Sequence, residues 1–383
     1  MTEPSGQPVA RVGLFVAFAS LGVTAAFVPA ILPVAERTIG ENLSNAVPVL
    51  FFGLLLGVLL VGPLRRMLRL RTTIMAGSAL QAVAVIAAGL STRPATFLAA
   101  AAVAGVGFGL VEAAGSIAAK HATTGSATGL LSALTGTVAC CAAVTPLVVA
   151  ATSAEPRASC ALAAIPAAAV FLVRDVGAPQ SAPVISTRAV SSLWLVLPYA
   201  LALPLYVGVE TMLSGWSAII PERALSLEPG VAALGTSAFW TLMALGRFGA
   251  AALRRRGLGP GAILAVGSIA ATAGLTCGAA FIREQPVWAL VSTAVAVTAL
   301  APTYGLILGL ALDHLDAARG HAVTGVLVAC GSLGGALVPA AILLTARDPA
   351  SVFTYAASAA LCALIPVLAG WGRRRGTRVS AAR

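Results

Sequence analysis

Three side chains that carry a charge at neutral pH in water lie inside long apolar stretches of this sequence: Glu112, Glu210 and Arg247. An ionised carboxylate is costly in an apolar interior unless it is paired or reached by water, so such acids often bind and release protons. Glu112 precedes Lys120 by eight residues, which is roughly 12 Å along a helix. We interpret Glu112 as a proton-coupling residue. The alternative is a structural glutamate that is hydrogen-bonded to a neighbouring helix.

Glu210 and Arg247 form a second candidate group. Glu210 follows Pro198 and Pro204 within one apolar stretch, and proline interrupts the hydrogen bonding of a helix. Interrupted helices often line binding sites in membrane proteins. We predict that Glu210 and Arg247 contact a substrate or gate one mouth of a cavity. A simple ion pair between the two is the alternative, and the sequence leaves both open.

Other polar side chains are scarce in these stretches. The side-chain amides are Gln81 and, at the edge of its stretch, Asn45. Unpaired buried polar groups are costly, so this scarcity argues against a site built only to bind many hydroxyl groups. Aromatic side chains could line a cavity or anchor helices at the membrane interface. The further candidates for substrate contact or gating are Gln81, Tyr206, Trp216, Trp240 and Tyr304.

We expect these residues to lie on membrane-spanning helices. Of 383 residues, 59% are apolar and 10% are charged, against about 45–50% and about 25% in soluble domains. No soluble fold could bury this much apolar surface. A window of about 20 residues, which crosses a hydrocarbon core of about 30 Å, marks twelve segments. They are 12–34, 45–63, 72–90, 95–118, 127–150, 158–173, 191–213, 231–252, 260–281, 286–312, 322–345 and 350–371.

The basic residues indicate the orientation of these segments. The net charge is +11, but the basic residues flank apolar segments, which is a signal of topology rather than of nucleic-acid binding. With the N-terminus inside, 17 of the 24 basic residues lie in cytoplasmic segments and six lie in outer loops. This asymmetry predicts a multi-pass protein of the cytoplasmic (inner) membrane with both termini in the cytoplasm. The lipid bilayer is then a partner, and nucleic acid is not.

Sequence features recur at about half the chain length. Thr128-Gly129 recurs as Thr324-Gly325, 196 residues later, and the arginine cluster that begins at Arg65 recurs at Arg254, 189 residues later. The two offsets predict a six-plus-six duplication, an arrangement in which binding sites lie near the membrane midplane. The predicted parts are an N-terminal bundle over 1–175, a cytoplasmic connector over 176–190 and a C-terminal bundle over 191–383.

Several other functions are not supported. The sequence has no G-x-x-x-x-G-K-[ST] motif, which excludes transport driven directly by ATP bound to this chain. The six cysteines lie in or beside apolar segments without C-x-x-C spacing, and the three histidines lie at predicted cytoplasmic helix ends. We therefore expect no metal site, no cofactor, no catalytic residue and no enzymatic activity.

Over nearly its whole length the sequence resembles the major facilitator superfamily. Residues 62–71 keep the glycine and the basic tail of the superfamily's loop signature, with Arg66 in place of its Asp. The glycine-rich stretch 105–114 that contains Glu112 looks like a motif of the fucose–proton symporter family, as do the segments around Tyr206 to Glu210 and Gly246-Arg247. Ser116 stands where that family has Asn, so the resemblance adds Ser116 to the candidate contacts. The family's acidic residue in the first span has no counterpart here.

These features predict an all-α membrane protein with twelve transmembrane helices in two pseudo-symmetric six-helix bundles, the major facilitator fold. The expected function is proton-coupled secondary transport of a small organic solute, which the resemblance implies is a sugar or a related metabolite. Proton-driven efflux of an amphipathic drug or metabolite is the main alternative, favoured by the missing acid in the first span. A transport-inactive receptor or scaffold is a more remote one. The expected partners are a small-molecule substrate and protons, and we expect a monomer.

Overall fold

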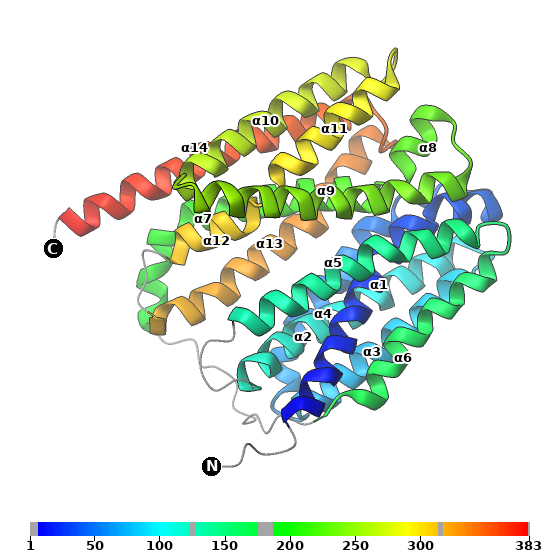
Figure 1. Ribbon diagram of the computed structural model, residues 1–383, viewed down its shortest axis with the longest axis horizontal. Coiled ribbons are helices and arrows are strands. Elements are labelled where there is room, and N and C mark those ends of the chain that lie inside the picture. Colours follow the sequence, from blue (N-terminus) through cyan, green and yellow to red (C-terminus); the bar gives the residue numbers. More distant parts are fainter. Residues whose placement is uncertain (1–6, 123–127, 175–186, 313–316, 382–383) are drawn as a thin grey trace. The chain divides into compact units, whose positions relative to one another are not determined.

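The described part of the chain is helical almost throughout. The computed structural model describes residues 7–122, 128–174, 187–312 and 317–381 (Figure 1). The helices in these ranges are α1 (Gln7–Ile39), α2 (Ala46–Leu64), α3 (Leu70–Gly89), α4 (Pro94–His121), α5 (Thr128–Ala151), η1 (Pro156–Ala163), α6 (Ala164–Leu172), α7 (Thr187–Gly215), α8 (Ile219–Leu225), α9 (Pro229–Arg255), α10 (Pro260–Phe281), α11 (Pro286–Leu300), α12 (Thr303–Leu312), α13 (Ala317–Ala346) and α14 (Val352–Ala381).

Within the described residues, eleven helical segments are long and apolar enough to cross a membrane. They coincide with eleven of the twelve predicted segments. The remaining one, predicted at 158–173, forms the shorter apolar helix Pro156–Leu172. Its first eight residues are the 3-10 helix η1 and its last nine are α6. A 3-10 helix rises about 2.0 Å per residue, so these 17 residues extend over roughly 30 Å, about the thickness of the hydrocarbon core. The predicted class, an all-α membrane protein, is confirmed.

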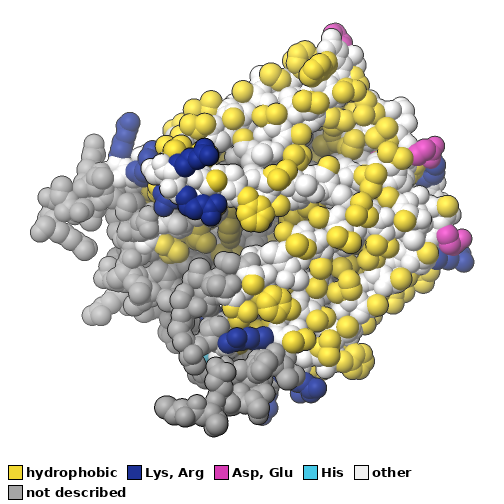
Figure 2. All heavy atoms as spheres, in the orientation of Figure 1, with side chains coloured by type: hydrophobic (Ala, Val, Ile, Leu, Met, Phe, Trp, Pro, Cys, Tyr) yellow, Lys and Arg dark blue, Asp and Glu magenta, His cyan; other side chains and the backbone are white. Residues whose placement is uncertain are grey.

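The outer faces of the helices are apolar. Large hydrophobic side chains are exposed along them, including Phe248 at 73%, Val266 at 67% and Leu344 at 85%. Figure 2 shows hydrophobic side chains spread over the surface that it presents, with the charged side chains gathered at helix ends. Such an exposed apolar surface is what helices present to lipid rather than to water.

Contacts divide the chain into two compact units. The first comprises Met1–Ala182, Ser217–Glu222 and Leu227–Trp240, and the second comprises Pro183–Trp216, Arg223–Ser226 and Thr241–Arg383. Residues of α9 therefore contribute to both units. The division of the chain into 1–175, 176–190 and 191–383 stays a prediction, since most of the connector lies outside the described residues.

Glycines bring α2 and α4 of the first unit together. A Cβ atom at Gly105 would collide with the carbonyl oxygen of Leu50, and one at Gly109 would collide with that of Leu54. On the facing helix, a Cβ at Gly57 would collide with the carbonyl oxygen of Val106. The two backbones are thus in direct contact, as small residues permit in membrane helices. This seam fixes α4, the helix that carries Glu112.

In the second unit α7 packs on α13, and α10 packs on α11 and α14. The predicted segment 286–312 is interrupted, because α11 ends at Leu300 and α12 begins at Thr303. Pro302 lies in the interruption. Proline has no backbone N–H to donate, so the hydrogen-bond ladder is broken there. This break lies beside Arg247, as described below.

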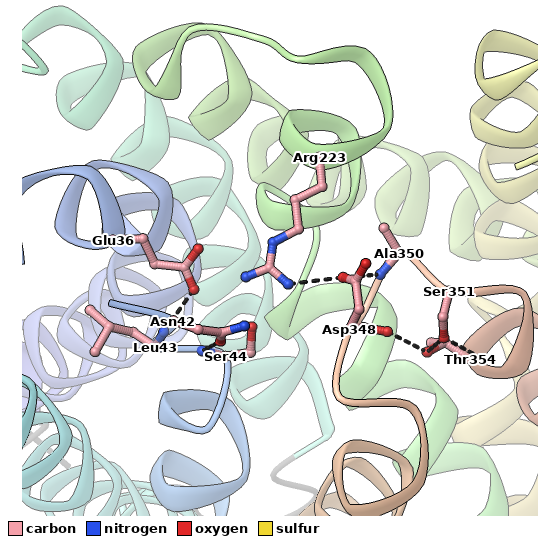
Figure 3. Close-up of polar contacts among 9 residues, drawn as sticks. All are labelled: Glu36, Asn42, Leu43, Ser44, Arg223, Asp348, Ala350, Ser351 and Thr354. Carbon is pink, nitrogen blue, oxygen red and sulfur yellow. Dashed lines mark hydrogen bonds and ion pairs between the residues drawn. The ribbon is translucent and has the colours of Figure 1, made fainter. Parts of the chain in front are cut away.

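Hydrogen bonds and an ion pair stabilise the loops between spans (Figure 3). In the first unit the Glu36 carboxylate accepts a hydrogen bond from the Leu43 backbone N–H at 2.8 Å. In the second unit Arg223 of α8 pairs with Asp348 in the loop between α13 and α14, with 2.9 Å between Nη1 and Oδ1. The same Asp348 oxygen accepts the Ala350 N–H at 3.0 Å. These contacts hold loop geometry at helix ends.

Candidate functional site

Glu112 lies in the membrane-spanning part of α4. This helix begins with Pro94 in its first turn, ends with Lys120 and His121 and runs through small and apolar residues. Val111 and Ala114, on either side of Glu112 in the chain, are buried in the hydrophobic core of the first unit, and Ala113 is partly buried against it. Glu112 itself is partly exposed. No described residue forms a hydrogen bond or an ion pair with its carboxylate.

Two features surround Glu112 on α4. Ser116 is also partly exposed and lies one turn further along, on the same face of the helix. At Gly115 the helix approaches α1, since a Cβ there would lie 2.8 Å from Cε2 of Phe18. Glu112 and Ser116 therefore form one polar strip on a helix that otherwise packs through small residues.

Gln81 occupies a buried polar cluster between α1 and α3. Its side chain is completely buried, and its Oε1 accepts a hydrogen bond from Thr24 Oγ1 at 2.6 Å. Gln81 Nε2 and the Ser78 hydroxyl, one turn apart on α3, are buried without a partner among the described residues. No hydrogen bond in the described part of the chain joins Gln81 to Glu112. Substrate contact by Gln81 stays a prediction, and the structure adds Thr24 and Ser78 to its surroundings.

Glu210 and Arg247 face each other in the second unit. Glu210 lies on α7 and Arg247 on α9, with 3.6 Å between Arg247 Nη2 and Glu210 Oε1. The Glu210 side chain is 22% exposed and the Arg247 side chain is 44% exposed. Arg247 Nε also donates a hydrogen bond to the carbonyl oxygen of Ala301 at 3.3 Å. One guanidinium thus contacts α7 and the end of α11 together.

Two tyrosines lie beside this pair. Tyr206, one turn before Glu210, is completely buried, and its ring centroid lies 6.3 Å from that of Tyr304 at an angle of 47°. The Tyr206 hydroxyl is buried beside the Glu210–Arg247 pair. The Thr303 hydroxyl is buried without a hydrogen-bond partner among the described residues. The structure therefore gathers Tyr206, Glu210, Arg247 and Tyr304 around the interruption between α11 and α12. We call these four residues the α7–α12 site.

Trp216 and Trp240 are the remaining aromatic candidates for substrate contact. Trp216 follows α7 directly and is completely buried. Trp240 lies in the part of α9 that clusters with the first unit, where its ring packs edge-on against Phe239 with centroids 5.5 Å apart. Its indole Nε1 is buried without a described partner. A role for either tryptophan in substrate contact stays a prediction.

Residues that could hold a metal do not gather in the described part of the chain. No group of three or more His, Cys, Asp or Glu side chains lies together there. Of the three histidines, His314 lies outside the described residues and the side chain of His321 is not described. Away from the ends of the described spans, the available chemistry is that of the Glu112 and Glu210 carboxylates, the Arg247 guanidinium, the Gln81 amide, hydroxyls, thiols and aromatic rings.

Sequence reasoning missed three features of these sites. Thr24 and Ser78 were not distinguishable from other hydroxyl residues of apolar helices, because their importance depends on which helices pack together. The interruption at 301–302 did have a signal, which was Pro302 within a predicted span of 27 residues. A proline at that position predicts a break, and Arg247 then becomes a donor for a carbonyl at the break.

No family model and no curated protein matches the chain. Solved structures do resemble it in fold. The xylose transporter XylE from E. coli matches with a TM-score of 0.72 at 14% identity, over 95% of this chain and 97% of XylE. The E. coli fucose:proton symporter FucP, a major facilitator superfamily transporter, matches with a TM-score of 0.64 at 16% identity, over 96% of this chain and 99% of FucP. The nucleoside transporter NupG matches with a TM-score of 0.71 at 10% identity, over 96% and 99%.

These likenesses establish the fold. The chain resembles in fold a structure described as a major facilitator superfamily transporter, over 95% of its length, and the predicted resemblance is confirmed at this level. Sequence identities of 10–16% carry no information about which solute is bound. Function is therefore argued from the residues themselves.

Proposed function

We propose that this chain is a secondary active transporter that moves a small organic solute across the membrane by alternating access, coupled to protons at Glu112. The observation that carries the proposal is the Glu112 carboxylate, which lies within a membrane span and lacks a partner among the described residues. A permanently ionised, unpaired carboxylate is strongly disfavoured there. Reversible protonation removes the charge, and it ties the stability of each conformation to the proton gradient.

The α7–α12 site supplies the solute contacts in this proposal. Glu210 accepts hydrogen bonds, Arg247 donates them, and the two tyrosine rings provide apolar faces that also carry hydroxyls. A site of this composition suits a solute with both hydroxyls and an apolar face, such as a sugar or a nucleoside. The fold neighbours include proteins named for xylose, fucose and nucleosides, which supports testing these classes first.

The experiment uses the full-length protein in liposomes with an imposed pH gradient. Radiolabelled D-xylose, L-fucose and uridine are offered in turn, and accumulation is followed in both directions of the gradient. We expect wild-type protein to accumulate one of these solutes against its concentration gradient. Glu112→Gln should lose this accumulation, yet it should still exchange labelled for unlabelled solute, since exchange needs no net proton movement.

Two results would contradict the proposal. Uphill accumulation by Glu112→Gln at the wild-type level would remove Glu112 from proton coupling. Loss of both accumulation and exchange in this variant, with both kept in the control Glu284→Gln, would show that Glu112 is needed for solute movement itself rather than for its coupling to protons. Glu284 is an exposed glutamate between α10 and α11, so its neutralisation should change neither activity. Solute expulsion driven by protons, in place of uptake, would assign the protein to efflux.

A further inference from the structure

Two polar side chains of α3, Ser78 and Gln81, are completely buried and keep hydrogen-bonding atoms that no described residue satisfies. Gln81 Oε1 accepts a hydrogen bond from Thr24 Oγ1 of α1 at 2.6 Å. Gln81 Nε2 and Ser78 Oγ have no partner in the described part of the chain. A buried polar group without a partner is costly. These two atoms therefore indicate a ligand.

The geometry of a helix places these two atoms near each other. Residues three apart are neighbours on the helix surface, with about 5–6 Å between their Cβ atoms. A long side chain on a helix points back toward the preceding turn, which for Gln81 is the turn that holds Ser78. The two atoms are not hydrogen-bonded to each other. One ligand atom between them, at about 2.9 Å from each, would satisfy both.

Close helix packing limits the size of this ligand. A Cβ atom at Gly107 of α4 would lie 2.6 Å from the carbonyl oxygen of Gly77 and 3.0 Å from Gln81 Cγ. A Cβ atom at Gly77 would lie 2.8 Å from Val111 Cγ2. Helices α3 and α4 are therefore in direct contact along the stretch that carries Gln81. A ligand at this depth has to be small.

The chemistry of the two atoms excludes a charged ligand. Gln81 Nε2 only donates hydrogen bonds, so it repels a cation, and α3 contains no acidic residue. An anion would need a positive partner. The basic side chain nearest in the chain is Arg71, ten residues from Gln81, and its Nε donates to the carbonyl oxygen of Val173. An unpaired charge is strongly disfavoured in an apolar interior.

Water meets each of these requirements. It is small and neutral, it accepts a hydrogen bond from an amide, and it either donates to a hydroxyl or accepts from one. Buried waters commonly satisfy polar groups that lack a protein partner. We propose that Gln81 Nε2 and Ser78 Oγ bind one water molecule. The water extends the bond between Thr24 and Gln81 into a network that joins α1 to two turns of α3.

The second unit repeats this stretch of helix. Gly267-Ser268 of α10 lies 190 residues after Gly77-Ser78 of α3, close to the offsets of the predicted duplication. A Cβ atom at Gly267 would lie 2.6 Å from the carbonyl oxygen of Ala299 on α11. In both units the glycine thus meets the backbone of the next helix.

The repeat lacks the amide. Ser268 is completely buried without a partner among the described residues, as Ser78 is. Three residues later the second unit has Ala271, which is also completely buried, where the first unit has Gln81. The proposed water site depends on the amide, so Ser268 is a matched control for Ser78.

The test is a double-mutant cycle on the full-length protein in detergent, read as melting temperature. Ser78→Ala removes one partner of the water, and it should lower the melting temperature by about 2–4 °C, the shift expected for one ordinary hydrogen bond. In a Gln81→Met background the site is already lost, so Ser78→Ala should cause no further decrease. Ser268→Ala should have the same effect in both backgrounds, because Gln81 is not part of its surroundings.

A direct measurement does not depend on any variant. A crystallographic or cryo-EM map of the wild-type protein, at a resolution that shows ordered water, should contain density within hydrogen-bond distance of both Gln81 Nε2 and Ser78 Oγ. Such a map decides the question if Ser78→Ala or Gln81→Met fails to fold.

Three results would overturn the proposal. The first is a map of that quality without this density. The second is a rise in melting temperature for Ser78→Ala in both backgrounds, because removal of a hydroxyl that binds nothing relieves an unpaired polar group. The third is an equal decrease in both backgrounds, which would show that Ser78 and Gln81 share no ligand. None of these readouts involves transport, so failure here is distinct from failure of the proposed function.

Discussion

Arg247 on α9 donates a hydrogen bond from its Nε to the backbone carbonyl oxygen of Ala301, where α11 ends. The contact depends on a close approach of the two helices. Gly246 provides it, since a Cβ there would collide with the carbonyl oxygen of Thr298. The Thr298 carbonyl is the one that would bond the N–H missing from Pro302. Gly246 and Arg247 thus hold α9 against two backbone carbonyls at the break.

The first prediction concerns this close approach. Gly246→Ala should lower the melting temperature of the detergent-purified protein, because the new methyl group meets backbone and overpacking of this kind costs about 1–3 kcal/mol. Gly249→Ala, on the same helix, meets nothing within 4 Å. It should raise the melting temperature slightly, since alanine favours a helix over glycine by about 1 kcal/mol. Equal shifts for the two variants would argue against the close approach.

A second prediction concerns the ion pair. Arg247→Gln should destabilise the protein because it leaves the Glu210 carboxylate without its partner. Removal of one member of a buried pair costs about 3–5 kcal/mol. Since Arg247 is 44% exposed, we expect a smaller loss, about 1–2 kcal/mol. Adding Glu210→Gln should recover part of it. If the two side chains do not interact, the losses in the free energy of unfolding of the two single variants should add. The double variant would then be less stable than Arg247→Gln by the full loss measured for Glu210→Gln alone.

A third prediction concerns the buried amide. Thr24→Val keeps the shape of the side chain but removes the hydroxyl that bonds Gln81 Oε1 at 2.6 Å. The Gln81 amide would then have no described partner, which should cost about 1–3 kcal/mol of stability. Thr276→Val is the matched control, because Thr276 is exposed and bonds only the Thr272 carbonyl of its own helix. Comparable losses in melting temperature would show that the Thr24 bond is not special.

These contacts indicate how far sequence reasoning reaches. The helices and the membrane class could be predicted because the length and the apolar composition of each segment can be read directly from the sequence. The pairing of Glu210 with Arg247 could be proposed because few charges lie in the spans. The bond between Thr24 and Gln81 could not, because it joins residues 57 apart and depends on the packing of α1 against α3.

Local irregularities were harder to predict than spans. Helix α8, which lies between two predicted segments, was not predicted. Its seven residues are too few to show a periodic pattern. The 3-10 geometry of η1 was not predicted either, because an apolar window does not distinguish 3-10 from α. The break at 301–302 also went unpredicted, although Pro302 marks it. Each of these depends on the backbone hydrogen bonding of a few residues, to which hydropathy is insensitive.

The fourth prediction concerns pH at the end of α1. Arg37 Nη1 lies 2.7 Å from Glu228 Oε2, and this hydrogen bond lowers the pKa of Glu228 below its usual value. The pair therefore stabilises the protein above the ordinary glutamate pKa of about 4.3, and the contribution is lost as pH falls through the lowered pKa. Glu228→Gln should lower the melting temperature slightly at neutral pH and not at strongly acidic pH.

The effect should be small, since both side chains are exposed and salt screens the pair. Thermal unfolding of wild-type and Glu228→Gln protein at a series of pH values measures it, with Glu284→Gln as the reference for an unpaired loop carboxylate. A stability difference that persists unchanged at strongly acidic pH would rule out the ion pair as its cause.

The depth of Glu112 in α4 has an electrical consequence. The residue lies roughly 12 Å from Lys120 along the helix, which is about two fifths of a hydrocarbon core of about 30 Å. A proton that reaches it from the nearer side crosses that share of the membrane voltage, and one from the farther side crosses the remainder. At about 2.3 kcal/mol per charge per 100 mV, voltage alone shifts the occupancy of this carboxylate severalfold. If Glu112 carries the coupled proton, as we propose, the driving force on it includes the membrane potential as well as the pH gradient.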